Sequence, residues 1–357
     1  MNAVLSGLSS VAESSPGLWR LAGRRLLKDR VGVVSAIIVA FFLLLMIASA
    51  TGLIAADWNK EVGVSYANPS FLAGQENLEA KKHKATTEKT DIPPADLSDV
   101  DPLAPWYGEW EKRTKEIKVS EPQQAEALPF GGDKWGRDIV KKTIKGAQSS
   151  IVVGLVSAFI AVFLGTLFGA VAGYFGKWVG DFFEWFYNVF TSIPYILLIL
   201  AFAAVFGSSP FLAQFRGMPM VILILSLTGW TGIYRLVRAE YMKHRSREYV
   251  RAAEAIGASD QRRMFVHILP NVSHVVLVQL SQHVVGFIKA EVILSFLGFG
   301  VPIESVSWGT MLAEAQNELV IGKWWQLVAA GASMALLVTA FSMFTDALRD
   351  ALDPKLK

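Results

Sequence analysis

The sequence contains no cysteine and little charge. Only 18% of its 357 residues are Asp, Glu, Lys or Arg, whereas 52% are hydrophobic. The absence of cysteine excludes disulfide bonds, thiolate metal sites and a cysteine nucleophile. Low charge combined with high hydrophobicity does not suit a soluble surface, so the composition indicates a chain that lies in lipid. A net charge of +3 is too small to indicate a nucleic-acid partner.

Two functional motifs are also missing. The phosphate-binding loop G-x-x-x-x-G-K-[ST] is absent, because Gly176-Lys177 and Gly322-Lys323 are each followed by Trp. A zinc-binding His-Glu-x-x-His motif is absent as well. We therefore expect that this chain has no catalytic residues and no metal site, that it binds no cofactor, and that it cannot hydrolyse ATP unaided.

Long stretches without charge predict membrane-spanning helices. Between Arg30 and Asp57 lie 26 uncharged residues, and about 20 apolar residues are enough to cross the hydrocarbon core of a bilayer. A cleavable signal peptide, the competing interpretation of this stretch, would have a shorter apolar region. Five more such stretches follow, so we expect an all-α membrane protein with six transmembrane helices. Their expected cores are 31–54, 150–173, 185–206, 219–237, 275–297 and 325–345.

The distribution of Lys and Arg predicts the orientation of these helices. Residues 1–30 carry five basic residues and the connection 235–263 carries eight, and the positive-inside rule places such segments in the cytoplasm. The segment 57–145 has 30 charged residues, 14 of them basic, but a loop of this length escapes the rule, so its external position follows from parity. The expected organisation is a cytoplasmic segment 1–30, a transmembrane helix 31–54, an external insert 55–149, a transmembrane core 150–345 with a cytoplasmic loop 238–274, and a cytoplasmic tail 346–357.

Small residues recur every four positions in the second predicted span. They are Ser157, Ala161, Gly165, Gly169 and Gly173. A face of this kind lets another helix approach closely. The spacing leaves open whether that helix belongs to the same chain or to another subunit.

The cytoplasmic loop predicts two short helices separated by a glycine. Good helix formers run from Glu248 to Ile256, with Arg251 and Glu254 spaced as a charged pair on one face. Gly257 is expected to end this helix, Ser259 to cap a second helix over 260–268, and Pro270 to end that one. The alternative is a solvated basic loop that serves only membrane orientation.

Four motifs resemble a known family. The run Arg251-Ala252-Ala253-Glu254-Ala255-Ile256-Gly257, followed by Leu269-Pro270, resembles the "EAA" loop of bacterial ABC importer permeases. Arg251 stands where the general motif has Glu, as is common in the peptide-importer branch. The segments 132–138, 291–300 with 307–309, and 346–354 are similar to signatures of that branch, the oligopeptide/dipeptide importer permeases of the C-subunit type.

This resemblance implies a type I ABC importer permease fold in the plasma (inner) membrane of a bacterium. It implies a non-catalytic subunit that forms half of a peptide pathway, as a heterodimer with a second permease subunit. Two ATP-binding subunits, which bind ATP and Mg, would dock on the 248–270 loop, and an external substrate-binding protein would deliver the peptide. The residues expected to couple the pathway to the ATPase are Arg251, Ala252, Ala253, Glu254, Gly257, Leu269 and Pro270.

Ionisable residues in the fifth span are candidates for the translocation pathway, because charge at membrane depth is costly. Lys289 and Glu291 are two residues apart and must point to different faces. Glu291 is expected to reach the Ser295 hydroxyl one turn on, or a cation of the partner permease. The candidates are His283, Lys289, Glu291, Ser295 and Trp308. Lining of the pathway and polar contacts between helices remain equal alternatives, and interfacial anchoring is the default role of Trp308.

A helix with an apolar stripe is expected outside the membrane, within residues 302–323. Ser307 is placed to cap it, and Met311, Leu312, Ala315 and Leu319 form a stripe. The insert segment 57–129 matches no signature, and much of 75–127 is expected to be loop. It either caps the external mouth or contacts the binding protein, or it only decorates the surface.

Two other functional classes compete with this interpretation. A secondary transporter or channel would need no large cytoplasmic docking loop. An intramembrane serine hydrolase would use Ser333 of the sixth span with His283 as its base, which requires hydrogen-bond contact between the two.

Overall fold

The computed structural model describes residues 18–72, 103, 106–116, 124–301 and 305–352, in two compact units. One unit comprises residues 1–56 and 141–357, and the other comprises residues 57–140. The helices outside the insert are α1 Leu18–Lys28, α2 Arg30–Ala50, α5 Ile139–Phe175, α6 Lys177–Thr191, α7 Tyr195–Ser208, α8 Met218–Thr228, α9 Thr231–Arg245, α10 Glu248–Ala255, α11 Asp260–Arg262, α12 Leu269–Phe296, α13 Trp308–Val320 and α14 Trp325–Leu352, together with the 3-10 helix η2 Pro210–Phe215 and the π-helix η3 Arg263–Ile268.

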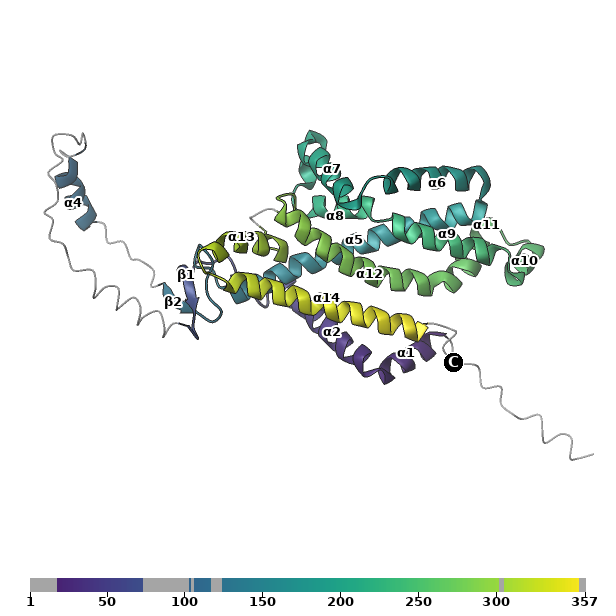
Figure 1. Ribbon diagram of the computed structural model, residues 1–357, viewed down its shortest axis with the longest axis horizontal. Helices are drawn as coiled ribbons and strands as arrows, with labels where there is room; N and C mark the ends of the chain where they lie inside the picture. The colour runs from purple at the N-terminus through teal and green to yellow at the C-terminus, as the bar shows by residue number, and fades with distance from the viewer. Residues whose placement is uncertain (1–17, 73–102, 104–105, 117–123, 302–304, 353–357) are drawn as a thin grey trace, which may run out of the picture. The chain divides into compact units, whose positions relative to one another are not determined.

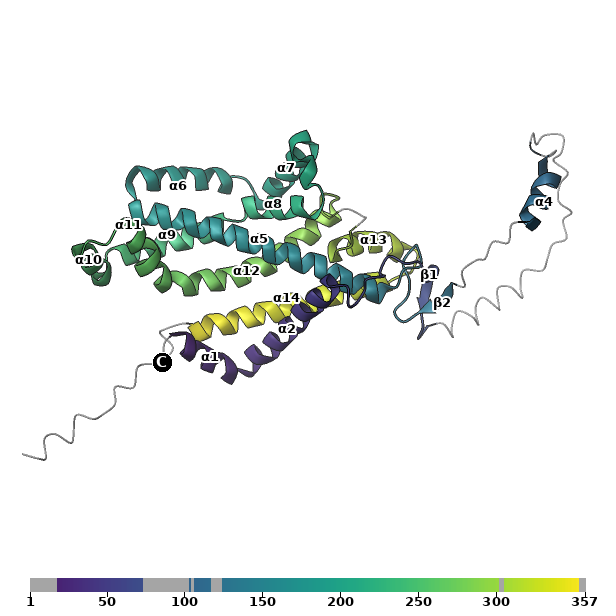
Figure 2. The same cartoon turned by 180° about the vertical axis from the view of Figure 1, so that it is seen from behind.

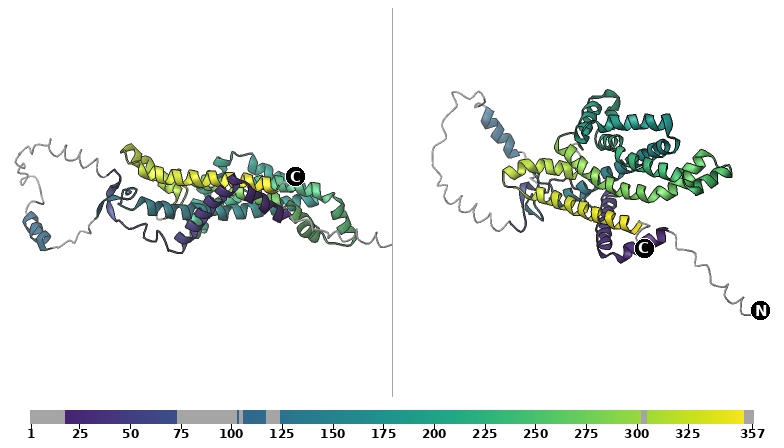
Figure 3. Two further views of the ribbon diagram at one scale, coloured as in Figure 1. Left: turned by 90° about the horizontal axis from the view of Figure 1, so that it is seen from below. Right: turned by 45° about the vertical axis from the view of Figure 1, so that its right-hand side comes forward.

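Five helical segments are long and apolar enough to cross a membrane. They are Arg30–Ala50, Ile139–Phe175, Met218–Arg245, Asp260–Phe296 and Trp325–Leu352. The first and last of these, α2 and α14, lie side by side in every view (Figures 1, 2 and 3). The expectation of an all-helical membrane core is confirmed.

The third predicted span, 185–206, is not one continuous helix. The structure divides it into α6 and α7, whose axes meet at 89°. The break coincides with Pro194, which has no backbone N–H to donate and which disfavours the helical conformation for the residue before it. The pair counts as a sixth span only if the two bent helices cross the membrane together.

Pro270 also differs from its expected role. It lies in the first turn of α12, directly after a π-helical turn, and does not end the helix. The π-helical turn η3 joins α11 to α12, so the second loop helix continues into the fifth span instead of ending before it. The second half of the predicted cytoplasmic loop and α12 are therefore parts of one helical segment, Asp260–Phe296.

The insert unit contains a two-stranded parallel sheet. Strand β1, Gly63–Pro69, pairs with strand β2, Ala125–Leu128, and a short helix α4 spans Tyr107–Glu116. The signature 132–138 folds as a turn next to β1, in which the Asp133 carboxylate accepts the backbone N–H groups of Trp135 and Arg137 at 2.9 and 3.0 Å. Most of the region expected to be loop, 75–127, lies outside the described residues, and the role of the insert stays a prediction.

The small-residue face of α5 packs against α9 of the same chain. A Cβ added to Gly169 would lie 2.7 Å from the carbonyl oxygen of Tyr234, and one added to Gly173 would lie 2.6 Å from that of Arg238. Gly165 makes the same kind of approach to Trp230 and Ile233. Of the two alternatives for this face, close packing inside the subunit is therefore observed.

We predict that Gly169→Ala destabilises the protein by about 1–3 kcal/mol, because overpacking against backbone atoms forces the two helices apart. Thermal unfolding of the purified protein in detergent measures this. Gly286→Ala in α12 is the matched control, since a Cβ there meets nothing within 4 Å. Equal unfolding temperatures for the two variants would contradict the importance of the α5–α9 contact.

Candidate functional site

The loop 238–274, which is predicted to be cytoplasmic, has the helix, glycine and cap that the sequence predicts. Helix α10 ends in a Schellman motif, in which Ala258 N–H donates to Ala253 O at 3.0 Å and Gly257 N–H to Glu254 O at 2.9 Å. Gly257 has a φ of +82°, a left-handed conformation that favours glycine. The Ser259 hydroxyl then accepts the N–H of Arg262 at 3.4 Å and caps the next helix.

The loop is packed onto the spans by an apolar cluster. Val250 and Ala253 of α10 are buried, and Val250 belongs to a cluster with residues of α9, η3 and α12. The hydroxyl of Tyr241 in α9 donates to the carbonyl oxygen of Met264 in η3 at 3.2 Å. A solvated basic loop would bury no such side chains, so this alternative is not supported.

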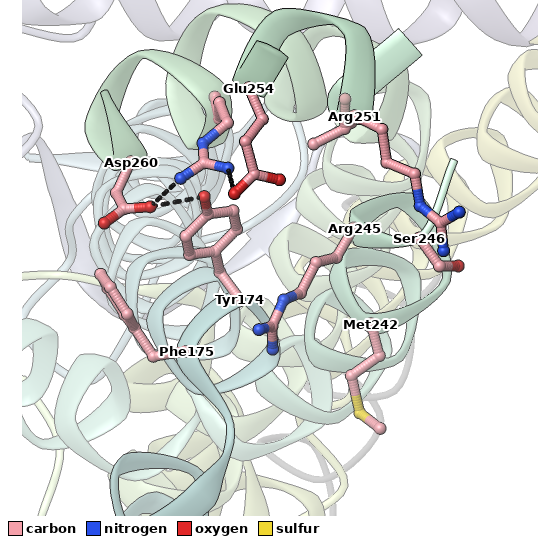
Figure 4. A pocket seen from close by; sticks show the side chains of 10 residues that line it. Tyr174, Phe175, Met242, Arg245, Ser246, Arg251, Glu254 and Asp260 are labelled. Carbon is pink, nitrogen blue, oxygen red and sulfur yellow. Dashed lines mark hydrogen bonds and ion pairs between the residues drawn. The ribbon is translucent and has the colours of Figure 1, made fainter. Parts of the chain in front are cut away.

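An ionic cluster ties the loop to the end of α5 (Figure 4). The guanidinium of Arg263 contacts the Glu254 carboxylate at 2.7 Å and the Asp260 carboxylate at 2.5 Å. The Tyr174 hydroxyl donates to Asp260 at 2.8 Å. Glu254 thus pairs with Arg263, whereas the sequence suggested Arg251. Sequence reasoning missed Tyr174, because nothing local relates a residue of α5 to one that follows 86 positions later.

The seven predicted coupling residues lie on two neighbouring parts of the loop. Arg251, Ala252, Ala253, Glu254 and Gly257 lie on α10 and the turn after it, while Leu269 and Pro270 begin α12. Ala253 is buried and anchors the loop, whereas Arg251 and Ala252 are exposed. The sequence-based selection omitted Ile256, whose side chain is 86% exposed at the tip of the loop. An apolar side chain so exposed indicates a surface that a partner can cover.

A second polar site surrounds Glu291 in α12, whose side chain is fully buried. Its carboxylate accepts hydrogen bonds from the hydroxyls of Ser295 at 2.7 Å, Ser307 at 2.7 Å and Ser150 at 2.9 Å. Ser150 also accepts the backbone N–H of Trp308 at 3.1 Å. These residues come from α5, α12 and the start of α13. The expected contact between Glu291 and Ser295 is confirmed.

Ser307 connects the carboxylate to the predicted external helix. It caps α13 in a reciprocal box with Thr310. Of the predicted stripe, Met311 and Ala315 are buried and Leu312 is partly buried, whereas Leu319 is 49% exposed. Trp308 is fully buried, and its indole N–H donates to Thr143 O at 3.2 Å. Interfacial anchoring is therefore wrong for Trp308. Tight burial of Glu291, Ser295 and Trp308 favours polar contacts between helices over lining of a pathway.

The other two pathway candidates lie elsewhere on α12. Lys289 is exposed and lines a cavity of about 200 Å³ between α7 and α12, whose other lining residues are apolar apart from Tyr195. His283 places its ring nitrogens 2.7 Å from Gln279 O and 3.2 Å from Gly229 O. This geometry leaves His283 no ring nitrogen for proton abstraction from Ser333, so the hydrolase alternative is not favoured.

Comparison with known proteins gives matches over most of the chain. The family model "Binding-protein-dependent transport system inner membrane component" matches residues 165–357. The dipeptide transport system permease protein DppC of Bacillus subtilis is 34% identical over 228 residues, which cover 64% of this chain and 69% of that protein. The oligopeptide transport system permease protein OppC of the same organism is 30% identical over 255 residues, covering 71% and 81%. The di/tripeptide transport system permease protein DppC of Pseudomonas aeruginosa is 32% identical over 261 residues, covering 71% and 83%.

We predict that Glu291→Gln destabilises the protein by about 1–3 kcal/mol, because the amide nitrogen cannot accept a hydrogen bond. At least one serine hydroxyl then loses its acceptor inside the protein. Ser150 has little freedom to turn, since its oxygen already accepts from Trp308. The unfolding temperature of the purified protein measures the loss.

Lys289→Gln provides the control for this prediction. The residue lies on the same helix but is exposed, and its substitution is expected to change stability by no more than about 0.5 kcal/mol. If Glu291→Gln behaves like Lys289→Gln, the carboxylate does not organise the three helices.

Proposed function

The chain belongs to the family of binding-protein-dependent transport system inner membrane components, and from this premise we propose that it is a permease subunit of an ATP-driven peptide importer. The family confirms the resemblance to ABC importer permeases, and a secondary transporter or channel is not favoured. A peptide cargo is proposed because relatives at 30–34% identity are named as dipeptide and oligopeptide permeases.

The observation that best supports this function is the rigid cytoplasmic loop with an exposed tip. Ile256 and Arg251 face outward on it, while Val250 and the Arg263 ion pairs hold it to the spans. Because η3 continues into α12, a force on the tip moves the fifth span as a body. Rigid-body movement around a site within the membrane is how alternating access is achieved in transporters.

The proposed complex assigns the other steps to other chains. Two ATP-binding subunits, which hold ATP and Mg, dock on α10, and this chain is non-catalytic. A second permease subunit completes the pathway as a heterodimer, and an external binding protein delivers the peptide. Both termini lie in the cytoplasm. These assignments rest on the family, the exposed loop tip and the basic residues of 235–263.

Within this chain, Lys289 is the strongest remaining pathway candidate. It is exposed at membrane depth beside an apolar cavity, a position that is costly in lipid but not in a water-filled pathway. Glu291, Ser295 and Trp308 are assigned a supporting role behind it. His283 is assigned to helix packing because of its two carbonyl contacts.

We predict that cells without this chain fail to take up labelled di- and oligopeptides, and that the plasmid-borne gene restores uptake. Uptake should depend on ATP and on an external binding protein that co-purifies with the complex. If the deletion strain takes up peptides normally but loses uptake of a different solute, the chain is a subunit of an importer whose cargo is not a peptide.

We predict that Gly257→Val uncouples ATP hydrolysis from uptake, because a β-branched residue resists the φ of +82°. A Cβ at this position meets nothing within 4 Å, so the effect arises from the backbone turn and not from crowding. Uptake in reconstituted vesicles should fall by about tenfold or more, whereas the ATP-binding subunits remain bound. A tenfold fall in the rate corresponds to an increase of about 1.4 kcal/mol in the activation free energy of coupled transport.

Gly257→Asn is the matched control, because Asn adopts the left-handed conformation more readily than other residues. It should retain most of the uptake. Normal transport by Gly257→Val with its ATPase still bound would show that the turn has no role in coupling.

A further inference from the structure

A cavity of about 530 Å³ opens beside the cytoplasmic loop, between the end of α5, the end of α9, and α10 with the start of the next helix (Figure 4). Its lining residues are Tyr174, Phe175, Met242, Arg245, Ser246, Val250, Arg251, Glu254, Asp260 and Arg263. This cavity is separate from the Glu291 site, but it shares Arg251 and Glu254 with the residues expected to couple the pathway to the ATPase. It contains three arginines and two carboxylates, which is a net positive lining.

Within the chain, the guanidinium of Arg263 balances only one of the two carboxylate charges of the cavity. Glu254 and Asp260 both bind Arg263. Asp260 also accepts the Tyr174 hydroxyl. Among the residues that the structure describes, Arg245 and Arg251 form no ion pair. Figure 4 shows their side chains away from the dashed bonds of the carboxylate cluster. The cluster of Arg263, Glu254 and Asp260 keeps one negative charge, so Arg245 and Arg251 together leave the cavity with one surplus positive charge.

Aromatic residues near the cavity are of the kind that gather at the level of the lipid headgroups. Tyr174 and Phe175 end the apolar helix α5, and α6 follows with Trp178, Phe182 and Trp185 exposed on one face. Trp and Tyr gather at the boundary between the hydrocarbon core and water. The basic residues of the following connection indicate that this is the cytoplasmic boundary, where the leaflet is anionic.

The wall of the cavity has an apolar part as well as a cationic part. Phe175 and Met242 line it and are 41% and 54% exposed. A purely ionic partner, such as a free phosphate or an acidic side chain, would leave these two side chains in water. An amphiphile with a negative headgroup satisfies both parts.

We propose that this cavity binds the headgroup of an anionic phospholipid from the cytoplasmic leaflet. The phosphate oxygens accept hydrogen bonds from Arg245 and Arg251, since a guanidinium suits bidentate contact with phosphate. Phe175 and Met242 contact the first methylene groups of the acyl chains. Because Arg245 ends α9 and Arg251 lies in α10, the lipid bridges the two helices and steadies the loop. The proposal goes beyond the transport function and does not depend on the cargo.

The test uses the wild-type assembly purified from membranes in mild detergent. Phosphatidylglycerol or phosphatidylcholine is titrated in, and native mass spectrometry counts the bound lipid. Arg245→Gln/Arg251→Gln should weaken phosphatidylglycerol binding by about 25-fold, because each basic residue near an anionic surface contributes about fivefold. Binding of phosphatidylcholine should be weak in both proteins.

Arg247→Gln/Arg262→Gln is the matched control. It removes the same charge from the same loop, but neither residue lines the cavity, so it should bind phosphatidylglycerol like the wild type. An equal loss in this control would show general electrostatic attraction and overturn the proposal. If Arg245→Gln/Arg251→Gln fails to fold, Arg245→Lys/Arg251→Lys replaces it and should keep a clear preference for phosphatidylglycerol.

Three further results would overturn the proposal. One is a wild-type assembly with no preference for phosphatidylglycerol over phosphatidylcholine. Another is protection against thermal unfolding by inorganic phosphate that is seen for the wild type but not for the double Gln variant, while both proteins retain the same amount of lipid. This result would identify a site for a free anion. The third is loss of the ATP-binding subunits from the double Gln variant with unchanged lipid binding, which assigns the arginines to a protein contact.

Discussion

The close approach of α5 to α9 is the constraint on which the functional loop depends. Glycines at 165, 169 and 173 bring the backbone of α5 against α9 over two turns. This contact fixes the end of α5 relative to α9, and Tyr174 at that end holds Asp260 by a hydrogen bond. Asp260 in turn shares Arg263 with Glu254 of α10. A packing contact between two apolar helices thereby positions a charged cluster on the loop that the distribution of Lys and Arg predicts to be cytoplasmic.

Helix α12 connects this cluster to the second polar site. Its segment Asp260–Phe296 begins at the loop and contains Glu291, whose three serine contacts join α5 and the cap of α13. A buried carboxylate with all these donors is costly to disturb, because removing one partner leaves a polar group unsatisfied. The same segment is thus anchored near both ends, which suits an element that transmits movement through the membrane.

Local features of this protein were predictable, and contacts between distant segments were not. The Gly257 turn, the Ser259 and Ser307 caps and the contact of Glu291 with Ser295 all follow from residues within one helical turn. The pairing of Glu254 with Arg263 and the burial of Trp308 did not follow, because each depends on which helices meet. The bend at Pro194 was overlooked because hydropathy continues across it.

Composition, charge-free stretches and four motifs by themselves determined the class of protein, the expected orientation and the family. These properties are carried by single segments of chain, since a segment partitions into lipid or forms a turn according to its own residues. Only the tertiary structure decided that the glycine face of α5 serves this subunit, that the Glu291 cluster joins helices, and that Arg245 and Arg251 share a cavity. The reason is physical: side-chain partners depend on helix packing, and packing brings together residues that are far apart in sequence.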